Sequence, residues 1–267
     1  MGFLINPFLL SAPVSGFDAD AQAYFDKLDN AGYPLDSAQQ DWVNNRVLNL
    51  KGTAAGDITT EAVDVWNDIE LLVFYLYNAG AGTTAYAVVG GDSTGTITWE
   101  TEGVQPGSGA NHTFASSQEI AAGRHNGLSV NLKASQTSGQ SFSTFLEMNG
   151  GNYRVETTNS SNLKFSAGNS FDIVIPSVGH YDIQHILINL TGESSGVSQK
   201  GRLRVGGNDS GWVESGVTFT LPDPSDIATQ LDIGEKNRTR IESVVFTSAE
   251  LTEAQSDNVQ AILDAVN

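Results

Sequence analysis

The chain has 267 residues, which is enough for one large domain or for one domain with a small appendage. Its 13 basic and 31 acidic residues give a net charge of −18, so we expect no nucleic-acid partner and no insertion into a membrane. The absence of cysteine excludes disulfides, thiolate metal sites and a cysteine nucleophile, while 28 glycines predict β structure rich in turns.

The first 17 residues are largely apolar. Residues 1–10 contain no Lys or Arg and therefore lack the basic region of a signal peptide, and Asn6-Pro7 interrupts any helix there. We expect this segment to be an arm that packs against the chain's own core or against a neighbouring subunit.

Residues 18–80 have the spacing of helices. Apolar residues recur every three or four positions after Asp18 and Asp20, either of which could be the N-cap, and Gly32-Tyr33-Pro34 ends this first predicted helix. A second helix is predicted to begin at a capping box formed by Ser37 and Gln40. Together these helices suggest an anchoring region in front of the rest of the chain.

A third helix is predicted from Thr59 or Thr60, either of which is a suitable N-cap, to Leu76. Its last part, residues 71–77, is apolar on all sides and must therefore be buried. A strand is the alternative for this last part, because periodicity does not separate a short buried helix from a buried strand.

From residue 81 onward, short runs alternate between apolar and polar residues and are separated by clusters of Gly, Asn, Ser and Asp. The alternating apolar positions are Leu128, Val130 and Leu132; Phe171, Ile173 and Ile175; Leu203 and Val205; and Val217, Phe219 and Leu221. Short strands at near-regular spacing predict a two-sheet sandwich, in which the longer, apolar run Tyr181–Leu190 is expected to be a central strand.

The chain ends in a predicted helix that begins at a capping box of Thr252 and Gln255. The predicted organisation is an apolar arm (1–17), a helical anchoring region (18–80) and a sandwich with a closing helix (81–267). The expected fold class is mainly β, a two-sheet jelly-roll sandwich with an N-terminal helical region and a C-terminal helix.

Several segments of the last third resemble strands of concanavalin A-like (laminin G-like) sandwiches. They are Gly179–Ile188, Lys200–Gly207, Leu231–Gly234, and Ile241–Phe246 followed by Ala249–Gln255. Where that family usually has Asp-Gly in a turn, this chain has Gly206-Gly207. The resemblance implies a concanavalin A-like sandwich over about two thirds of the chain.

The front of the chain resembles the short helical region that precedes such sandwiches in tailed-phage virion proteins. The residues concerned are Asp18–Ala23, Asn49–Gly52 and Val65–Ile69, and Phe3–Phe8 resembles the apolar opening of those proteins. The resemblance implies a location in a virion, other virion proteins as partners, and assembly as a homo-oligomer.

The chain has many carboxylates, but few of them have the spacing of a catalytic pair. Enzymes of this fold that cut β-glucans resemble one another in a Glu-x-Asp-x-Glu strand, which this chain lacks. Its nearest approach is Glu100 and Glu102, alternate residues that would share one strand face roughly 7 Å apart. A solvent-facing strand end is the favoured interpretation, so we expect no catalytic residue and no enzyme. A polysaccharide-degrading enzyme with Glu100 or Glu102 in a cleft is the alternative.

Metal ligands and cofactor motifs are not apparent either. His180 and His185 are five residues apart, so on one strand they point to opposite faces. The oxygen-rich clusters at Asn208–Ser210 and at Asp223 with Asp226 lack the spacing of a calcium loop. We therefore expect neither a metal nor a cofactor.

Carbohydrate binding by a sandwich needs an exposed aromatic ring beside amide or carboxylate groups. Trp212 follows Asn208 and Asp209 in a predicted loop, so these three residues are the candidate glycan site. The alternative, at least as well supported by the sequence, is that Trp212 closes one end of the core.

Two basic trios alternate along predicted strands, and each would lie on one strand face. They are Lys200, Arg202 and Arg204, and Lys236, Arg238 and Arg240. One interpretation is a basic stripe that contacts an acidic patch on a neighbouring subunit or an anionic glycan. The other is an edge-strand guard, or local pairing with the surplus Asp and Glu. The sequence leaves the two open.

The function expected from the sequence is therefore that of a structural virion component: a spike, fibre or decoration protein. Its exposed sandwich would bind a host-surface glycan, and its high negative charge would keep crowded copies soluble.

Overall fold

The computed structural model describes residues 16–53, 63–75, 82–95, 97–100, 103–106, 113–119, 128–136, 144–148, 153–159, 162–167, 171–176, 178, 185–191, 200–214, 230–235 and 239–265. Several sequence predictions lie outside these residues, among them most of the apolar arm, the cap at Thr59 or Thr60, and the strand over 217–221.

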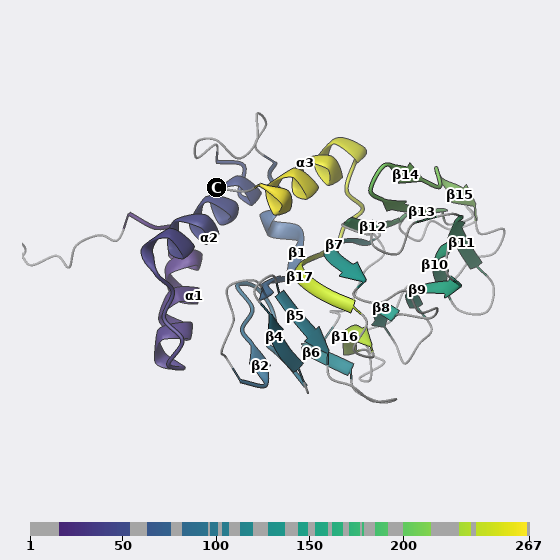
Figure 1. Ribbon diagram of the computed structural model, residues 1–267. Helices are drawn as coiled ribbons and strands as arrows, with labels where there is room; N and C mark the ends of the chain where they lie inside the picture. Colours follow the sequence, from purple (N-terminus) through teal and green to yellow (C-terminus); the bar gives the residue numbers. More distant parts are fainter. Residues whose placement is uncertain are drawn as a thin grey trace, which may run out of the picture.

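Two antiparallel sheets, one of nine strands and one of eight, make up the described β structure (Figure 1). The nine-stranded sheet contains β1 (Ile69–Phe74), β4 (Ile97–Glu100), β5 (Gly103–Pro106), β7 (Leu128–Gln136), β12 (His185–Leu190), β13 (Lys200–Val205), β14 (Asn208–Asp209), β15 (Val213–Glu214) and β17 (Thr239–Thr247). The eight-stranded sheet contains β2 (Thr84–Ala85), β3 (Ser93–Thr94), β6 (Thr113–Glu119), β8 (Thr144–Met148), β9 (Tyr153–Asn159), β10 (Asn162–Ala167), β11 (Phe171–Ile175) and β16 (Gln230–Glu235). The predicted sandwich is confirmed.

Strand β17 organises the nine-stranded sheet. One edge of β17 pairs with β7, and the other edge pairs with β1 over residues 243–247 and with β5 at Ile241. Along the strands, alternate side chains enter a core between the two sheets. This core includes Val130, Leu132, Phe145, Leu163, Phe165, Ile173, Ile186, Ile188, Leu203 and Phe246. The period-two pattern of the sequence is the pattern that this core uses.

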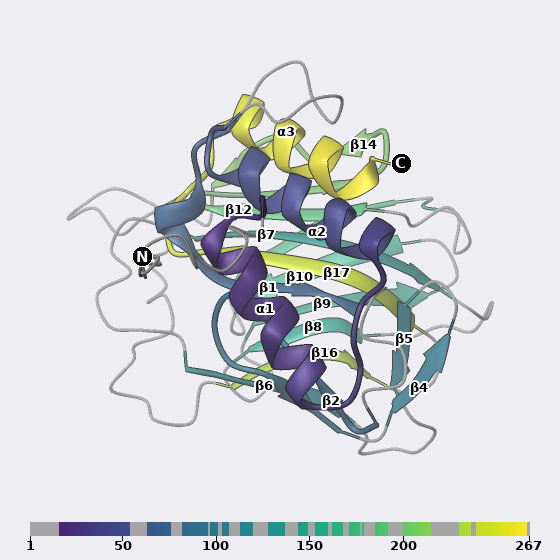
Figure 2. The same cartoon turned by 90° about the vertical axis from the view of Figure 1, so that its left-hand side faces the viewer.

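Three helices cover the outer face of the nine-stranded sheet (Figure 2). They are α1 (Ala19–Asn30), α2 (Ser37–Leu50) and α3 (Glu253–Asp264), and their apolar sides form a second core with β1 and β17. Among the described residues, no helix has the length and apolar content needed to cross a membrane.

The last part of the predicted third helix is strand β1 (Ile69–Phe74), so the helix predicted there is wrong and the strand given as its alternative is correct. Leu71 and Val73 point into the core between the sheets, while Leu72 and Phe74 point into the core beneath the helices. A strand with an apolar core on each side needs apolar residues at every position, which is why this run shows no polar face. The helical region over 18–80 therefore contains a strand of the main sheet, and the domain boundary at 80 does not separate helices from sandwich.

The helix caps agree with the sequence at two ends and differ at one. Asp18 caps α1, and Thr252 with Gln255 forms the predicted capping box of α3. The box of α2 is formed by Asp36 and Gln39, one residue before the predicted pair. The sequence Asp36-Ser37 places two good N-cap residues side by side, so the pattern alone does not decide the register.

Candidate functional site

The candidate site lies at the edge of the nine-stranded sheet, where β13, β14 and β15 meet. Arg204 and Val205 of β13 pair with β14, and Lys200 and Gly201 pair with β15. Two residues of β13 lie between these pairs, but three residues, 210–212, lie between β14 and β15. The returning chain therefore forms a bulge, which turns side chains out of the sheet.

Polar contacts hold this bulge in one conformation. The backbone N–H of Ser210 donates to the carbonyl of Leu203 at 3.0 Å, and the N–H of Leu203 donates to Ser210 Oγ at 3.0 Å. The Gly211 N–H donates to Asp209 Oδ1 at 2.8 Å, and Gly211 has a φ of +64°. Glycine adopts this left-handed conformation without steric cost, so the sequence Asp-Ser-Gly suits the bulge.

Trp212 is the residue that this bulge presents to solvent. It is 42% exposed, whereas Trp42 is buried and Trp99 packs against the core between the sheets. Val213, the next residue, packs against the same core. The side chain of Trp212 therefore does not close the core, and the loop position predicted for it is confirmed. Asn208, the second candidate, is also exposed.

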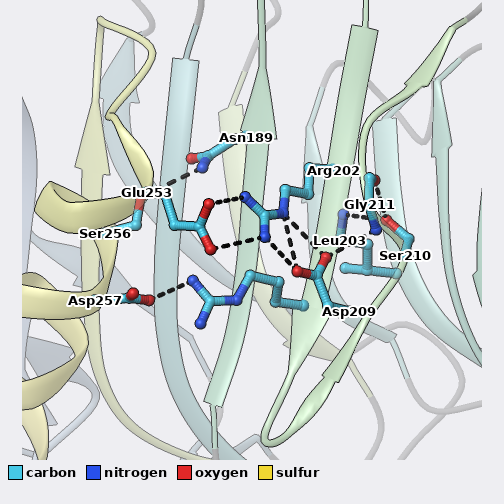
Figure 3. A network of polar contacts seen from close by, with 10 residues as sticks. Asn189, Arg202, Leu203, Asp209, Ser210, Gly211, Glu253, Ser256 and Asp257 are labelled. Atoms are coloured by element: carbon cyan, nitrogen blue, oxygen red, sulfur yellow. Dashed lines mark hydrogen bonds and ion pairs between the residues drawn. The ribbon is translucent and has the colours of Figure 1, made fainter.

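Asp209, the third candidate, has its carboxylate engaged within the chain. Arg202 Nε donates to both of its oxygens, at 2.9 and 3.2 Å, and Arg202 Nη2 donates to Oδ2 (Figure 3). The hydrogen bond from Arg202 lowers the pKa of Asp209, against the effect of partial burial. Because Asp209 also accepts from Gly211, its role in this structure is to hold the bulge rather than to face solvent freely.

Arg202 also contacts helix α3. Its Nη2 lies 3.1 Å from Glu253 Oε1, and its Nη1 lies 3.1 Å from Glu253 Oε2. Arg202 thus lies between two carboxylates from different elements, one from β14 and one from α3 (Figure 3). The hydrogen bonds to Asp209 and Glu253 raise the pKa of Arg202, although partial burial opposes them.

The rest of the first basic trio is paired in the same way. Lys200 lies 3.1 Å from Glu214, the residue opposite it in β15, and Arg204 pairs with Asp257 of α3. Of the two interpretations that the sequence leaves open for this trio, local pairing with acidic residues is the one that the contacts match. In the second trio, Lys236 and Arg238 lie outside the described residues, and Arg240 is a partly buried residue of β17.

The basic and acidic residues of β13, β14 and α3 thus form one network of ion pairs, and the sequence analysis did not identify its acidic members in α3, Glu253 and Asp257. Glu253 and Asp257 are four residues apart in α3, so they lie on one helix face, and Arg202 and Arg204 alternate on one strand face. Both regularities are visible in the sequence. Their meeting is not, because it depends on where α3 packs on the sheet. Asn189 and Ser256 add a buried hydrogen bond of 3.3 Å between the same two layers.

The carboxylates considered for catalysis are only partly placed by the structure. Glu100 ends β4, opposite Gly103 of β5, while Glu102 lies outside the described residues. Trp99, beside Glu100, donates from Nε1 to the carbonyl of Gly82 at 2.6 Å. Within the part of the chain that the structure describes, no three acidic or histidine side chains gather as a metal site would require.

No protein-family model matches this chain, and no curated protein matches its sequence. Solved structures do share its fold. A Trypanosoma rangeli sialidase matches 85% of this chain with a TM-score of 0.54 and 12% sequence identity. The structure of its covalent intermediate with 2,3-difluorosialic acid matches the same share with a TM-score of 0.56 and 13% identity. The binding domain of botulinum neurotoxin DC, in complex with rat synaptotagmin II, has 0.50 at 12% over 75%.

These matches show a common β-sandwich architecture and no more, because identities near 12% do not carry a site from one chain to another. The matches cover 39% of the first sialidase chain, 38% of its covalent intermediate and 52% of the neurotoxin domain. They also correct one expectation. The sequence led us to expect that this chain is not an enzyme. That exclusion was wrong, since solved chains with the same sandwich include sialidases.

Acidification is expected to weaken the network around Arg202. The pKa of Asp209 is lowered by its hydrogen bond from Arg202, so protons bind more readily to the unfolded chain. The stabilisation is therefore complete above about pH 4 and is lost as the pH falls through the lowered pKa. We expect Asp209→Asn to lower the free energy of unfolding by about 1 kcal/mol at pH 7, allowing for solvent screening, and by much less at pH 2.

Urea unfolding at pH 7 and pH 2 measures this difference. Asp172→Asn is the control, because Asp172 forms one ion pair with Lys164 and is about half exposed. An Asp209→Asn variant that loses equal stability at both pH values would contradict the assigned role of the carboxylate.

Proposed function

We propose that this chain is a surface component of a tailed-phage particle, and that its sandwich binds carbohydrate at the bulge that carries Trp212. The observation that supports the binding role most directly is an exposed indole on a backbone held by hydrogen bonds. An exposed indole offers an apolar face to the C–H face of a sugar ring, and exposed amide groups such as that of Asn208, four residues earlier in the same segment, suit sugar hydroxyls.

Preorganisation gives this bulge an advantage as a binding element. Asp209, Ser210 and Gly211 already fix the backbone around Trp212, so a ligand does not have to order the loop. Loop ordering is one of the main free-energy costs of association. A single aromatic platform of this kind is consistent with weak binding that becomes strong when many copies act together.

The virion part of the proposal is supported by the resemblance of residues 18–23, 49–52 and 65–69 to helical regions of tailed-phage proteins. In this proposal the amino-terminal arm and the helices contact other virion proteins or further copies of the chain, which leaves the sheet edge at Trp212 outside. A net charge of −18 suits crowded display on a particle. Antibody labelling of purified particles in the electron microscope is the measurement that tests this placement.

The binding role is tested with a printed panel of neutral and charged oligosaccharides. We expect the wild-type chain to bind some members, and Trp212→Ala to reduce that binding at least tenfold, while the free energy of unfolding changes by less than about 1 kcal/mol. Val174→Ala is the matched control, since Val174 is 45% exposed on β11 of the other sheet. Equal binding by wild type and Trp212→Ala would exclude Trp212 as the site.

A second candidate is a polysaccharide-degrading enzyme, and the sandwich shared with sialidases favours it. The same panel decides between the two if released sugars are measured as well as bound ones. Turnover that Glu100→Gln abolishes would support the enzyme, whereas binding without turnover would support the recognition role.

A further inference from the structure

We propose that the ligand at Trp212 is an uncharged sugar and not sialic acid or another anionic saccharide. This inference rests on the proposed function and names its ligand class. It is argued from the charges around the bulge, whose cations already have carboxylate partners within the chain.

All three nitrogens of the Arg202 guanidinium contact carboxylates. Nε and Nη2 donate to Asp209, and Nη1 and Nη2 contact Glu253. The Arg202 side chain is only 10% exposed. Recognition of a sugar carboxylate commonly uses the paired donors of an arginine. At this edge those donors are directed at the protein's own acids (Figure 3).

Arg202 cannot release Asp209 without loosening the bulge. Asp209 accepts the hydrogen bond from Gly211 that holds the backbone before Trp212. A ligand carboxylate that took the Nε and Nη2 donors of Arg202 from Asp209 would therefore compete with the contact that positions its own aromatic platform, and one that approached Nη1 would have to displace Glu253. The gain of one ion pair would be offset by the loss of another and by disorder in the loop.

The local charge also opposes an anion. Three cations of β13 face four carboxylates, Asp209, Glu214, Glu253 and Asp257, which leaves one net negative charge at this edge. The whole chain, this edge included, has a net charge of −18. This net negative charge opposes the approach of an anionic sugar over a range set by the Debye length, about 10 Å at 0.1 M salt. A neutral sugar would meet no such opposition.

The panel used for the proposed function tests this inference when its members are compared as matched pairs, such as lactose with 3′-sialyllactose and dextran with dextran sulfate. We expect the neutral member of a bound pair to bind at least tenfold more tightly. We also expect its affinity to stay unchanged between 20 and 150 mM NaCl. Trp212→Ala should abolish this binding.

A charge variant isolates the local effect. Glu253→Gln removes one of the two carboxylates that occupy Arg202, and we expect it to raise the affinity for the anionic member several-fold at 20 mM NaCl. Asp29→Asn, at the end of α1, makes the same change in net charge away from this network and should not do so.

The outcomes separate the two proposals. Tighter binding of the anionic member by the wild-type chain, lost in Trp212→Ala, would overturn the inference and leave the carbohydrate site in place. An equal response of Glu253→Gln and Asp29→Asn would show that net charge sets the preference, which overturns the role that the inference gives to the occupied Arg202. Binding to no member of the panel would overturn the carbohydrate role and the inference together.

Discussion

Gly103→Ala is expected to lower the free energy of unfolding by about 3 kcal/mol. Gly103 begins β5 with a φ of +128°, a conformation that residues with a side chain rarely adopt. A Cβ at this position would overlap the backbone carbonyl oxygen of Ile241 and lie 3.2 Å from Glu242 Cα. Both atoms belong to β17, which cannot move aside without breaking its pairing with β7. The overlap therefore cannot be relieved without the loss of backbone hydrogen bonds between β17 and β7.

Gly207→Ala is the matched control for this substitution. Gly207 lies in the turn between β13 and β14, and a Cβ there has no atom within 4 Å. We expect a change within about 0.5 kcal/mol. Denaturant unfolding of the two variants beside the wild type gives the comparison. Similar small losses for both would mean that β5 does not approach β17 as closely as described.

Leu71→Ala and Leu72→Ala are each expected to destabilise the chain by about 3 kcal/mol, because each leaves a cavity in a closely packed core. The two residues are neighbours in β1, but Leu71 lies in the core between the sheets and Leu72 in the core beneath the helices. Both side chains are fully buried. A strand with one face in water would show a large effect at only one of the two positions.

Val174→Ala provides the reference for truncation of a strand residue that faces solvent, and we expect it to change stability by less than about 0.5 kcal/mol. Urea unfolding of the three variants is sufficient. A small loss for either leucine variant would contradict the position of β1 between two cores.

Much of the fold follows from local patterns. The apolar spacing and caps of α1 and α3 lie within a dozen residues, and so does the alternation of Phe171, Ile173 and Ile175, so the sequence carries them directly. The apolar run that begins at Leu71 was different. Its described residues, 71–75, are all buried, and a pattern without a polar face indicates burial without indicating the period.

Only part of the candidate site was predictable from the sequence, namely the loop that carries Trp212. The cluster Asn208-Asp209-Ser210-Gly211 indicates a turn, and a tryptophan after it is unusual enough to notice. Whether that tryptophan faces solvent depends on the count of residues between two pairings with β13, which only the register reveals. The partners of Arg202 are seven residues away in one case and fifty-one in the other.

The sequence by itself thus determined the class of this protein as an acidic, cysteine-free chain of alternating strands closed by capped helices. Helical and strand periods arise from contacts between near neighbours, so they are present in any short window. The tertiary structure alone decided that β1 joins the main sheet, that α3 places its acids against the arginines of β13, and that Trp212 faces outward. These outcomes depend on which surfaces bury each other, and distant segments settle that only when the whole chain packs together.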